Sequence, residues 1–225
     1  FLVIVGDVDS QDTYQQVKQA FSAYAPISLP LSKTQHEISS YGVRQVNMKL
    51  NTKLPAIFLG YNVPSLKTAK DPSTAYTLAI ISALLTQGKS ALLTNDLIQQ
   101  KQLAVDISSS YNLYALHSDL LQIHLIPTST DISPQLQSQC LQHINQLKEK
   151  LISADALARA KTQLIAKQTY NKDQLINQAM QVGRIRASGL PLQTAYDYKS
   201  EINAVTAQQI QAVAKHYLTN NRLTI

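Results

Sequence analysis

The sequence predicts an α+β fold, in which a mostly antiparallel twisted sheet carries helices packed on one face. Apolar residues alternate in two segments, 103–112 and 117–126, and the connection between them is short. This arrangement is typical of an antiparallel hairpin. Residues 75–85, just upstream, are apolar on most sides, which predicts a buried helix. We therefore expect the helices of residues 71–100 to pack on one face of the sheet.

Composition limits the kind of protein this can be. A chain of 225 residues is long enough for one large domain, or for one domain with a piece of another. Its hydrophobic content of 44% and charged content of 15% are those of an ordinary globular protein. The net charge of +6 comes from Lys and Arg spread along the chain without a basic run, which favours a solvated basic surface over a nucleic-acid site. The sequence contains no apolar run of membrane-spanning length.

The N-terminal part is predicted to contain a strand, a helix and a linker. Residues 1–5 form an apolar run that ends at a Gly-Asp turn, which predicts a buried strand. Asp9 or Ser10 is placed to cap a helix that continues to about Tyr24. Residues 26–40 combine proline with Ser, Thr and Gln, a composition typical of a linker.

The middle of the chain carries clear start and stop signals. Residues 42–50 alternate weakly and predict a strand, with residues 56–63 as its neighbour in the sheet. Asp71 is expected to cap the buried helix, and Gly88 is expected to end it. Ser90 is then placed to cap a second helix, which leads into the hairpin.

The C-terminal part is predicted to be mostly helical. Ser153 caps a long helical pattern that Gly189 breaks. Thr206 and Gln209 have the spacing of a capping box, which predicts the start of the last helix. Residues 222–225 predict a final strand.

The stretch around the second helix resembles one family. In the insulinase/pitrilysin/mitochondrial processing peptidase family, the M16 zinc peptidases, the second homologous half carries a run like G-x-S-S-R-L-x-x-x-L-R-x-x-x-G-L-A-Y. Six residues of this chain fall on that pattern without a gap: Gly88, Ser90, Leu93, Leu97, Leu103 and Ala104. The resemblance implies the C-terminal homologous half of an M16 chain. It also implies that residues 1–30 are the closing strand and helix of the preceding half, residues 31–40 a linker, and residues 41–225 the second M16-like α+β domain.

Two polar residues of the family pattern are missing. Ile98 and Val105, seven residues apart, occupy the positions of the family's Arg and Tyr. In active members that pair is understood to hold the substrate backbone beside the zinc site. An Arg donates a planar fork to a carbonyl and a Tyr hydroxyl stabilises oxyanion charge, whereas Ile and Val do neither. Lys101 is no substitute because it lies three residues beyond Ile98 and lacks the fork. We therefore expect no catalytic residue in this chain.

A zinc site is not expected either. The family's inverted motif, H-x-x-E-H, is absent. None of the histidines lies four residues from another, and the five are His36, His117, His124, His143 and His216. The odd separation of His117 and His124 places them on opposite faces of a strand. The resemblance therefore implies no cofactor in this fragment, with zinc in the parent chain or in a partner half.

Other catalytic chemistry lacks an anchor. There is no G-x-S-x-G motif, and a phosphate-binding loop ending at Gly88 would need a glycine at position 83, which is Ala. Cys140 lies in an apolar helical pattern and is expected to be a buried structural thiol.

The resemblance leads to two functional hypotheses, and it leaves open whether the parent chain is an enzyme. In the first, the chain is the C-terminal non-zinc half of an M16-like zinc metalloendopeptidase; it forms part of the peptide-binding chamber and needs a partner half for activity. In the second, it is a catalytically inactive scaffold or partner subunit of an M16-type complex. A peptide-binding module such as a chaperone is a third class. An H-x-x-E-H motif upstream of Phe1 would favour the first hypothesis.

The expected partners follow from the same resemblance. They are the other M16 half, a homologous subunit in a homo- or heterodimer, and an unfolded peptide substrate, with no nucleic acid. The sequence establishes no compartment, although the family resemblance favours the periplasm or cell envelope.

Overall fold

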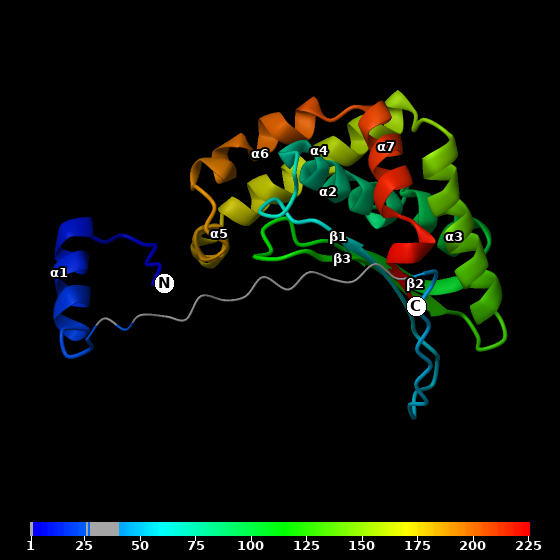
Figure 1. Ribbon diagram of the computed structural model, residues 1–225, viewed down its shortest axis with the longest axis horizontal. Helices are drawn as coiled ribbons and strands as arrows, with labels where there is room; N and C mark the ends of the chain where they lie inside the picture. Colours follow the sequence, from blue (N-terminus) through cyan, green and yellow to red (C-terminus); the bar gives the residue numbers. More distant parts are fainter. Residues whose placement is uncertain (1, 26, 28–40) are drawn as a thin grey trace.

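A layer of helices lies on one face of a four-stranded sheet (Figure 1). The computed structural model describes residues 2–25, 27 and 41–225. The predicted α+β class is confirmed, and so is the placement of the buried helix against the sheet, since α2 contacts β2. Within the described part of the chain, no helix is both long and apolar enough to cross a membrane.

The sheet is built from antiparallel pairs in the order β2-β3-β1-β4. Its strands are β1 (Ile57–Val63), β2 (Ala104–Ser110), β3 (Asp119–Pro127) and β4 (Leu223–Thr224). The hairpin predicted from residues 103–112 and 117–126 is confirmed, because β2 and β3 pair directly, with Ile107 opposite Leu125. The predicted C-terminal strand is also present as β4, although it is only two residues long.

The strand predicted over residues 42–50 is wrong, and so is its pairing with β1. β4 occupies the place beside β1, and only Arg44 forms a bridge, parallel to Thr224. The Arg44 amide donates to the Leu223 carbonyl at 3.0 Å, and the Val46 amide donates to the Ile225 carbonyl at 2.8 Å. Beyond this point the chain leaves the sheet and extends below it (Figure 1). The alternating apolar side chains of this segment are exposed, 65% for Val46, so there is no buried face to prolong the ladder.

The helical layer is organised around α2, which contacts α4, α6 and α7 as well as β2. The helices are α1 (Ser10–Ala20), α2 (Pro72–Thr86), the π-helix η1 (Thr94–Gln100), α3 (Ser133–Glu149), α4 (Ala154–Lys172), α5 (Leu175–Ala187), α6 (Gln193–Ala204), α7 (Ala207–Tyr217) and the 3₁₀ turn η2 (Asn220–Arg222). Because α2 is enclosed by the sheet and other helices, its apolar residues on most sides are explained by burial rather than by an amphipathic surface position.

The sequence signals at the ends of α2 work as predicted. The Asp71 side chain accepts the Ser73 amide at 2.9 Å, and Pro72 begins the helix. Gly88, just beyond its end, has φ +84°, a conformation that is strained for a residue with a Cβ. Leu78 and Ile81 between these ends are fully buried. Each such side chain stabilises the fold by about 1.5–3 kcal/mol relative to exposure.

Three more predicted caps are confirmed. The Asp9 side chain accepts the amides of Gln11 and Asp12, both at 2.9 Å. Ser153 caps α4 through the Ala156 amide at 3.3 Å. At α7, both hydrogen bonds of the Thr206–Gln209 capping box are present.

The single long helix predicted after Ser153 is instead two helices, α4 and α5. They are separated at Asp173 and Gln174, where Gln174 is extended with φ −105° and ψ 122°. Asp and Asn side chains compete with helical hydrogen bonds, so the Asn-Lys-Asp sequence at this point favours a helix end. Gly189, with φ +70°, then ends α5 as expected. The break allows α5 to turn back and contact α4 and α6.

The N-terminal segment does not form the predicted strand. Residues 2–5 have no strand partner, and Leu2 and Ile4 are exposed. A strand is stable only when a neighbour satisfies its backbone, and the described strands lie elsewhere. α1 follows, apart from the helical layer (Figure 1), and ends at Ala20 rather than near Tyr24. Pro26 and the linker predicted over residues 31–40 lie outside the described residues.

The turn between η1 and β2 holds a residue in an unfavourable conformation. Gln102 has φ +53°, and no other non-glycine residue among those described has a positive φ. The family pattern has Gly at this position. A left-handed conformation costs a residue with a Cβ about 1–2 kcal/mol, and glycine avoids most of that cost.

We predict that Gln102→Gly raises the free energy of unfolding by about 0.5–1 kcal/mol, because relief of the strain exceeds the added entropy of the unfolded chain. Urea denaturation measures the difference. The control is Gln100→Gly, at the end of η1, which should destabilise by a similar amount. Equal losses from both variants would contradict the strain at Gln102.

Candidate functional site

The two positions that the sequence pattern singles out lie in consecutive elements. Ile98 is on η1, half-buried and packed against the core. Val105 is on β2, and its side chain is 58% exposed. Neither side chain offers a donor, an acceptor or a charge. Their correspondence to the family's Arg and Tyr rests on sequence spacing and stays a prediction.

Both positions lie on irregular backbone. Thr94–Gln100 is a π-helix, and the Lys101 amide continues its wider pattern by donating to the Asp96 carbonyl at 2.9 Å. The ladder between β2 and β3 shifts register between Ala104 and Asp106, which leaves Val105 in a β-bulge. π-Helices and bulges re-aim side chains and are frequent at functional sites. The backbone here is therefore shaped like that of a site, while the side chains carry no chemistry.

This π-helix differs from the helix that the sequence predicts. The sequence pattern is ordinary for an α-helix. It predicted a helix capped by Ser90, but the helical stretch begins at Leu92, and no side-chain hydrogen bond caps η1. A shift of backbone hydrogen bonds by one residue has no signature in residue type, so no signal in the sequence indicated it.

A polar network fixes η1 to α3. His143 Nε2 lies 2.8 Å from Asp96 Oδ2, and Lys101 Nζ donates to the same oxygen at 2.7 Å. Lys101 also donates to Gln139 Oε1 at 2.7 Å. Burial alone would raise the pKa of Asp96, but the hydrogen bonds from Lys101 and His143 outweigh it and hold the pKa below its ordinary value. Lys101, already excluded as a replacement for the family's Arg, is thus occupied by a structural contact.

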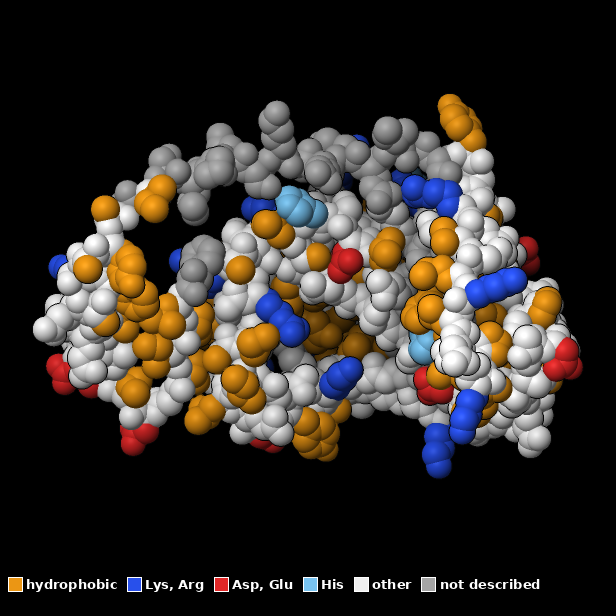
Figure 2. Space-filling model, turned by 90° about the horizontal axis from the view of Figure 1, so that it is seen from below, with side chains coloured by type: hydrophobic (Ala, Val, Ile, Leu, Met, Phe, Trp, Pro, Cys, Tyr) orange, Lys and Arg blue, Asp and Glu red, His pale blue; other side chains and the backbone are white. Residues whose placement is uncertain are grey.

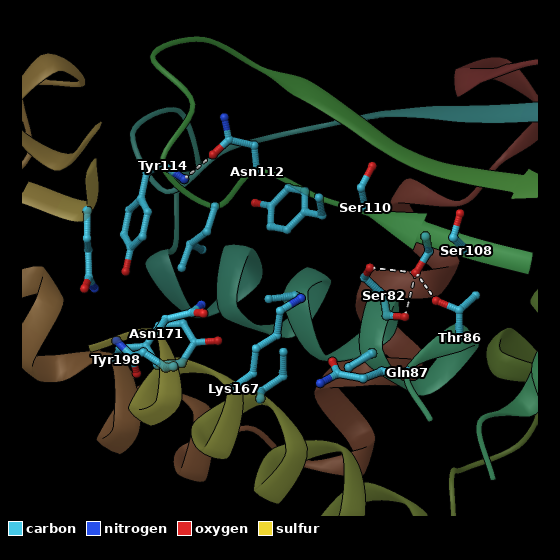
Figure 3. A pocket seen from close by; sticks show the side chains of 18 of the residues that line it. Ser82, Thr86, Gln87, Ser108, Ser110, Asn112, Tyr114, Lys167, Asn171 and Tyr198 are labelled. Carbon is cyan, nitrogen blue, oxygen red and sulfur yellow. Dashed lines mark hydrogen bonds between the residues drawn. The ribbon is translucent and has the colours of Figure 1, made fainter. Parts of the chain in front are cut away.

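A pocket of about 780 Å³ opens between β2 and the helices α2, α4 and α5 (Figure 3). Most of the residues that line it have polar side chains. They come from segments far apart in the chain, so no sequence pattern indicated the pocket. The residues labelled in Figure 3 are Ser82, Thr86, Gln87, Ser108, Ser110, Asn112, Tyr114, Lys167, Asn171 and Tyr198.

At one end of the pocket, three hydroxyl groups join β2 to α2. Ser109 Oγ lies 2.8 Å from Ser82 Oγ and 2.7 Å from Thr86 Oγ1, and it donates to the Ser82 carbonyl at 2.8 Å (Figure 3). None of the residues that line the pocket is His, Asp or Glu. The three hydroxyls hydrogen-bond to one another and to the Ser82 carbonyl, so their observed contacts hold β2 against α2.

The charge in the pocket is positive. Lys167 and Arg184 are the charged residues of its wall. Tyr114 Oη is buried and has no hydrogen-bond partner among the described residues. Burial raises the pKa of Tyr114; the Gln181 amide lies close enough to offset part of this rise, but its geometry does not make a hydrogen bond. Burial also raises the pKa of Tyr198 to about 12. Both phenols are therefore neutral hydroxyl donors near pH 7.

The histidines are dispersed over the structure. His124 stacks on Phe58 with 4.4 Å between ring centroids, and His216 meets the ring of Tyr217 edge-on. His117 lies before β3, which begins at Asp119, so the expected placement of His117 and His124 on opposite faces of one strand does not apply. His36 lies outside the described residues. Within the described ranges, no group of three or more His, Cys, Asp or Glu side chains could hold a metal ion.

Cys140 is a buried structural thiol, as predicted. It is fully buried on α3 within the core. Burial raises its pKa to about 12, so the reactive thiolate is scarce at neutral pH.

We predict that Asp96→Asn lowers the free energy of unfolding at pH 7 by about 1–2 kcal/mol, because two charge-assisted contacts are lost. The pKa of Asp96 is lowered in the folded state. Its stabilisation is therefore complete above the ordinary carboxyl pKa, and it disappears as the pH falls through the lowered value. Urea denaturation at pH 7 and at strongly acid pH, with Asp106→Asn as the exposed control, tests this. A deficit that is the same at both pH values would contradict it.

Comparisons with known proteins agree with the α+β fold described above. Residues 1–164 match the family described as the peptidase M16 inactive domain. No curated protein matches. The crystal structure of a protease from Helicobacter pylori superposes with TM-score 0.84 at 23% identity, over 98% of this chain and 52% of that one. The peptidase M16 inactive domain from Pseudomonas fluorescens gives 0.76 at 16% identity, over 97% and 51%.

One chain of a eukaryotic assembly has the same fold. A chain of complex III2 from Candida albicans, with Inz-5 bound, gives TM-score 0.74 at 13% identity, over 97% of this chain and 52% of that one. This chain thus spans about half the length of each of these three solved structures. Its sequence match over residues 1–164, with which the α+β architecture agrees, places the chain in the M16 peptidase family, as its C-terminal inactive domain.

Proposed function

We propose that this chain is the C-terminal, non-zinc half of an M16 zinc metalloendopeptidase chain, where it forms part of the chamber that holds a peptide. The observation that carries the proposal is the pair Ile98 and Val105. These apolar side chains occupy a π-helix and a bulge, two kinds of irregular backbone that are frequent at functional sites. A half without this pair and without metal ligands needs another half for the reaction. Zinc is then expected in the parent chain or in a partner half.

The N-terminal segment supports the proposed domain organisation. Several large apolar side chains are exposed on it: Leu2, Ile4, Val8, Tyr14, Phe21 and Tyr24. They belong to the part of the molecule around α1, at the left of Figure 1, where Figure 2 shows apolar side chains gathered. Residues 1–30 would be the closing strand and helix of the preceding half, and that half would cover these side chains. Residues 31–40 are then the linker, and residues 41–225 the second domain.

The proposed partners follow from the same organisation. The parent chain would act with a homologous subunit, in a homo- or heterodimer, that provides the missing Arg and Tyr. The substrate would be an unfolded peptide, because a chamber enclosed by two halves admits an extended chain more readily than a folded one.

A scaffold role is the second candidate. Its support is the fold shared with a chain of the Candida albicans complex III2, together with the apolar side chains of Ile98 and Val105. In this case the parent chain would lack H-x-x-E-H and would contribute only structure to its complex.

The test is a peptidase assay of the zinc-loaded parent chain on an unstructured peptide, alone and with candidate partner chains. We expect slow cleavage by the parent alone, since loss of one transition-state donor costs about 10²–10³-fold. A partner that carries the pair should restore cleavage. Full activity without any partner would contradict the argument from Ile98 and Val105, and no activity in any combination would favour the scaffold.

Substitutions sharpen this test. Ile98→Arg with Val105→Tyr should accelerate the parent alone and change little once a partner supplies the pair. The matched control, Ile98→Lys with Val105→Phe, introduces charge without the planar fork and a ring without the hydroxyl. Equal effects of the two double variants would show that the positions act through packing.

A further inference from the structure

We propose that the pocket between β2, α2, α4 and α5 binds a carboxylate group of an extended peptide. The inference rests on the proposed function, and it adds the chemical class that this half recognises. The carboxylate has two possible sources, the C-terminus of the peptide or an acidic side chain within it, and the experiment below distinguishes them.

The pocket lies where an extended chain can reach it. β2 is the outermost strand on its side of the sheet, with no neighbour beyond it among the described residues. Four consecutive residues of β2, 107–110, line the pocket. The pocket therefore runs along this edge strand for four residues, on the side that the helices cover. A peptide that lies along this edge could direct one of its groups into the pocket.

The positive charge of the pocket wall favours binding of an anionic group. Lys167 extends from α4 toward α2 (Figure 3), and Arg184 comes from α5. Within the described residues, neither side chain has a hydrogen bond or ion pair, whereas Lys101 is engaged by Asp96. With no carboxylate in the wall, the two cations lack an internal counterion. An anionic ligand group would supply one.

Neutral donors complete the site. Tyr114 lines the pocket, and its buried hydroxyl has no hydrogen-bond partner among the described residues, so it is a donor still to be satisfied. The Asn171 amide faces the same space (Figure 3). A carboxylate accepts several hydrogen bonds at its two oxygens, so it matches a wall with two cations and neutral donors. A buried hydroxyl without a partner destabilises a protein unless a ligand or water satisfies it.

The experiment measures binding of labelled unstructured peptides to the protein by fluorescence anisotropy. One pair of peptides differs only in a C-terminal acid or amide, and a second pair only in an internal Glu or Gln. We expect the acid form of one pair to bind about three- to tenfold more tightly than its neutral form. This ratio should fall as salt concentration rises, since both cations are exposed. The pair that shows the preference identifies the source of the carboxylate.

Variants test whether the pocket is responsible. Lys167→Gln and Arg184→Gln should each reduce the preference for the acid form about threefold. The controls are Lys172→Gln and Arg186→Gln, which change exposed cations on the same helices outside the pocket. They should leave the preference for the acid form unchanged. Tyr114→Phe should weaken binding of the acid form while leaving the melting temperature unchanged or higher, a combination that a purely structural role would not produce.

The outcomes separate the two proposals. If peptides bind but acid and neutral forms bind equally, or if the control variants act as strongly as the pocket variants, the pocket inference is overturned and the peptide chamber stands. If no peptide binds in any form, the pocket inference is also overturned, and the peptidase assay of the parent chain with its partners decides the peptide chamber. The site is established if the protein binds the acid form of a peptide more tightly, and if only the variants at Lys167, Arg184 and Tyr114 reduce this preference.

Discussion

The burial of α2 is the constraint on which the rest of the structure depends. This helix is apolar on most sides and lies between the sheet and the outer helices, so its stability comes from enclosure. The sheet alone has only four strands, one of them two residues long. Without α2 its inner face would have no continuous apolar partner. The outer helices, the edge strand and the pocket are all arranged around this one element.

Features specified by neighbouring residues could be predicted from the sequence. The hairpin, the ends of α2 and the capping box at Thr206 each depend on side chains a few residues apart, and each was found. Features that depend on distant segments could not be predicted. The strand beside β1 is β4, not residues 42–50. This could not be predicted, because a pairing between residues about 160 positions apart leaves no local pattern in the sequence. The break at Gln174 has a weaker signal: Asn171 and Asp173 disfavour helix, but neither Gly nor Pro marks the end, so the helical pattern of residues 154–187 continues in the sequence without a clear stop.

The candidate site divides in the same way. Ile98 and Val105 were identified because their spacing matches a linear pattern, but the π-helix and the bulge beneath them are backbone properties without a residue signature. The pocket was invisible in the sequence because Lys167 and Arg184 join the end of β2 only after two helices fold back over the sheet. Polar residues on a helix surface look the same whether they face solvent or a cavity.

The hydroxyl cluster at Ser109 has a consequence for the orientation of α2. Contact between apolar surfaces has little directionality. A helix that is apolar on most sides could therefore turn about its axis or slide along the sheet at a small cost in free energy. Ser82 and Thr86 remove this freedom, because any rotation would strand their oxygens in an apolar contact. Burial alone would allow many rotations of the central helix about its axis. Hydrogen bonds between two helix residues one turn apart and one strand residue select a single rotation among them.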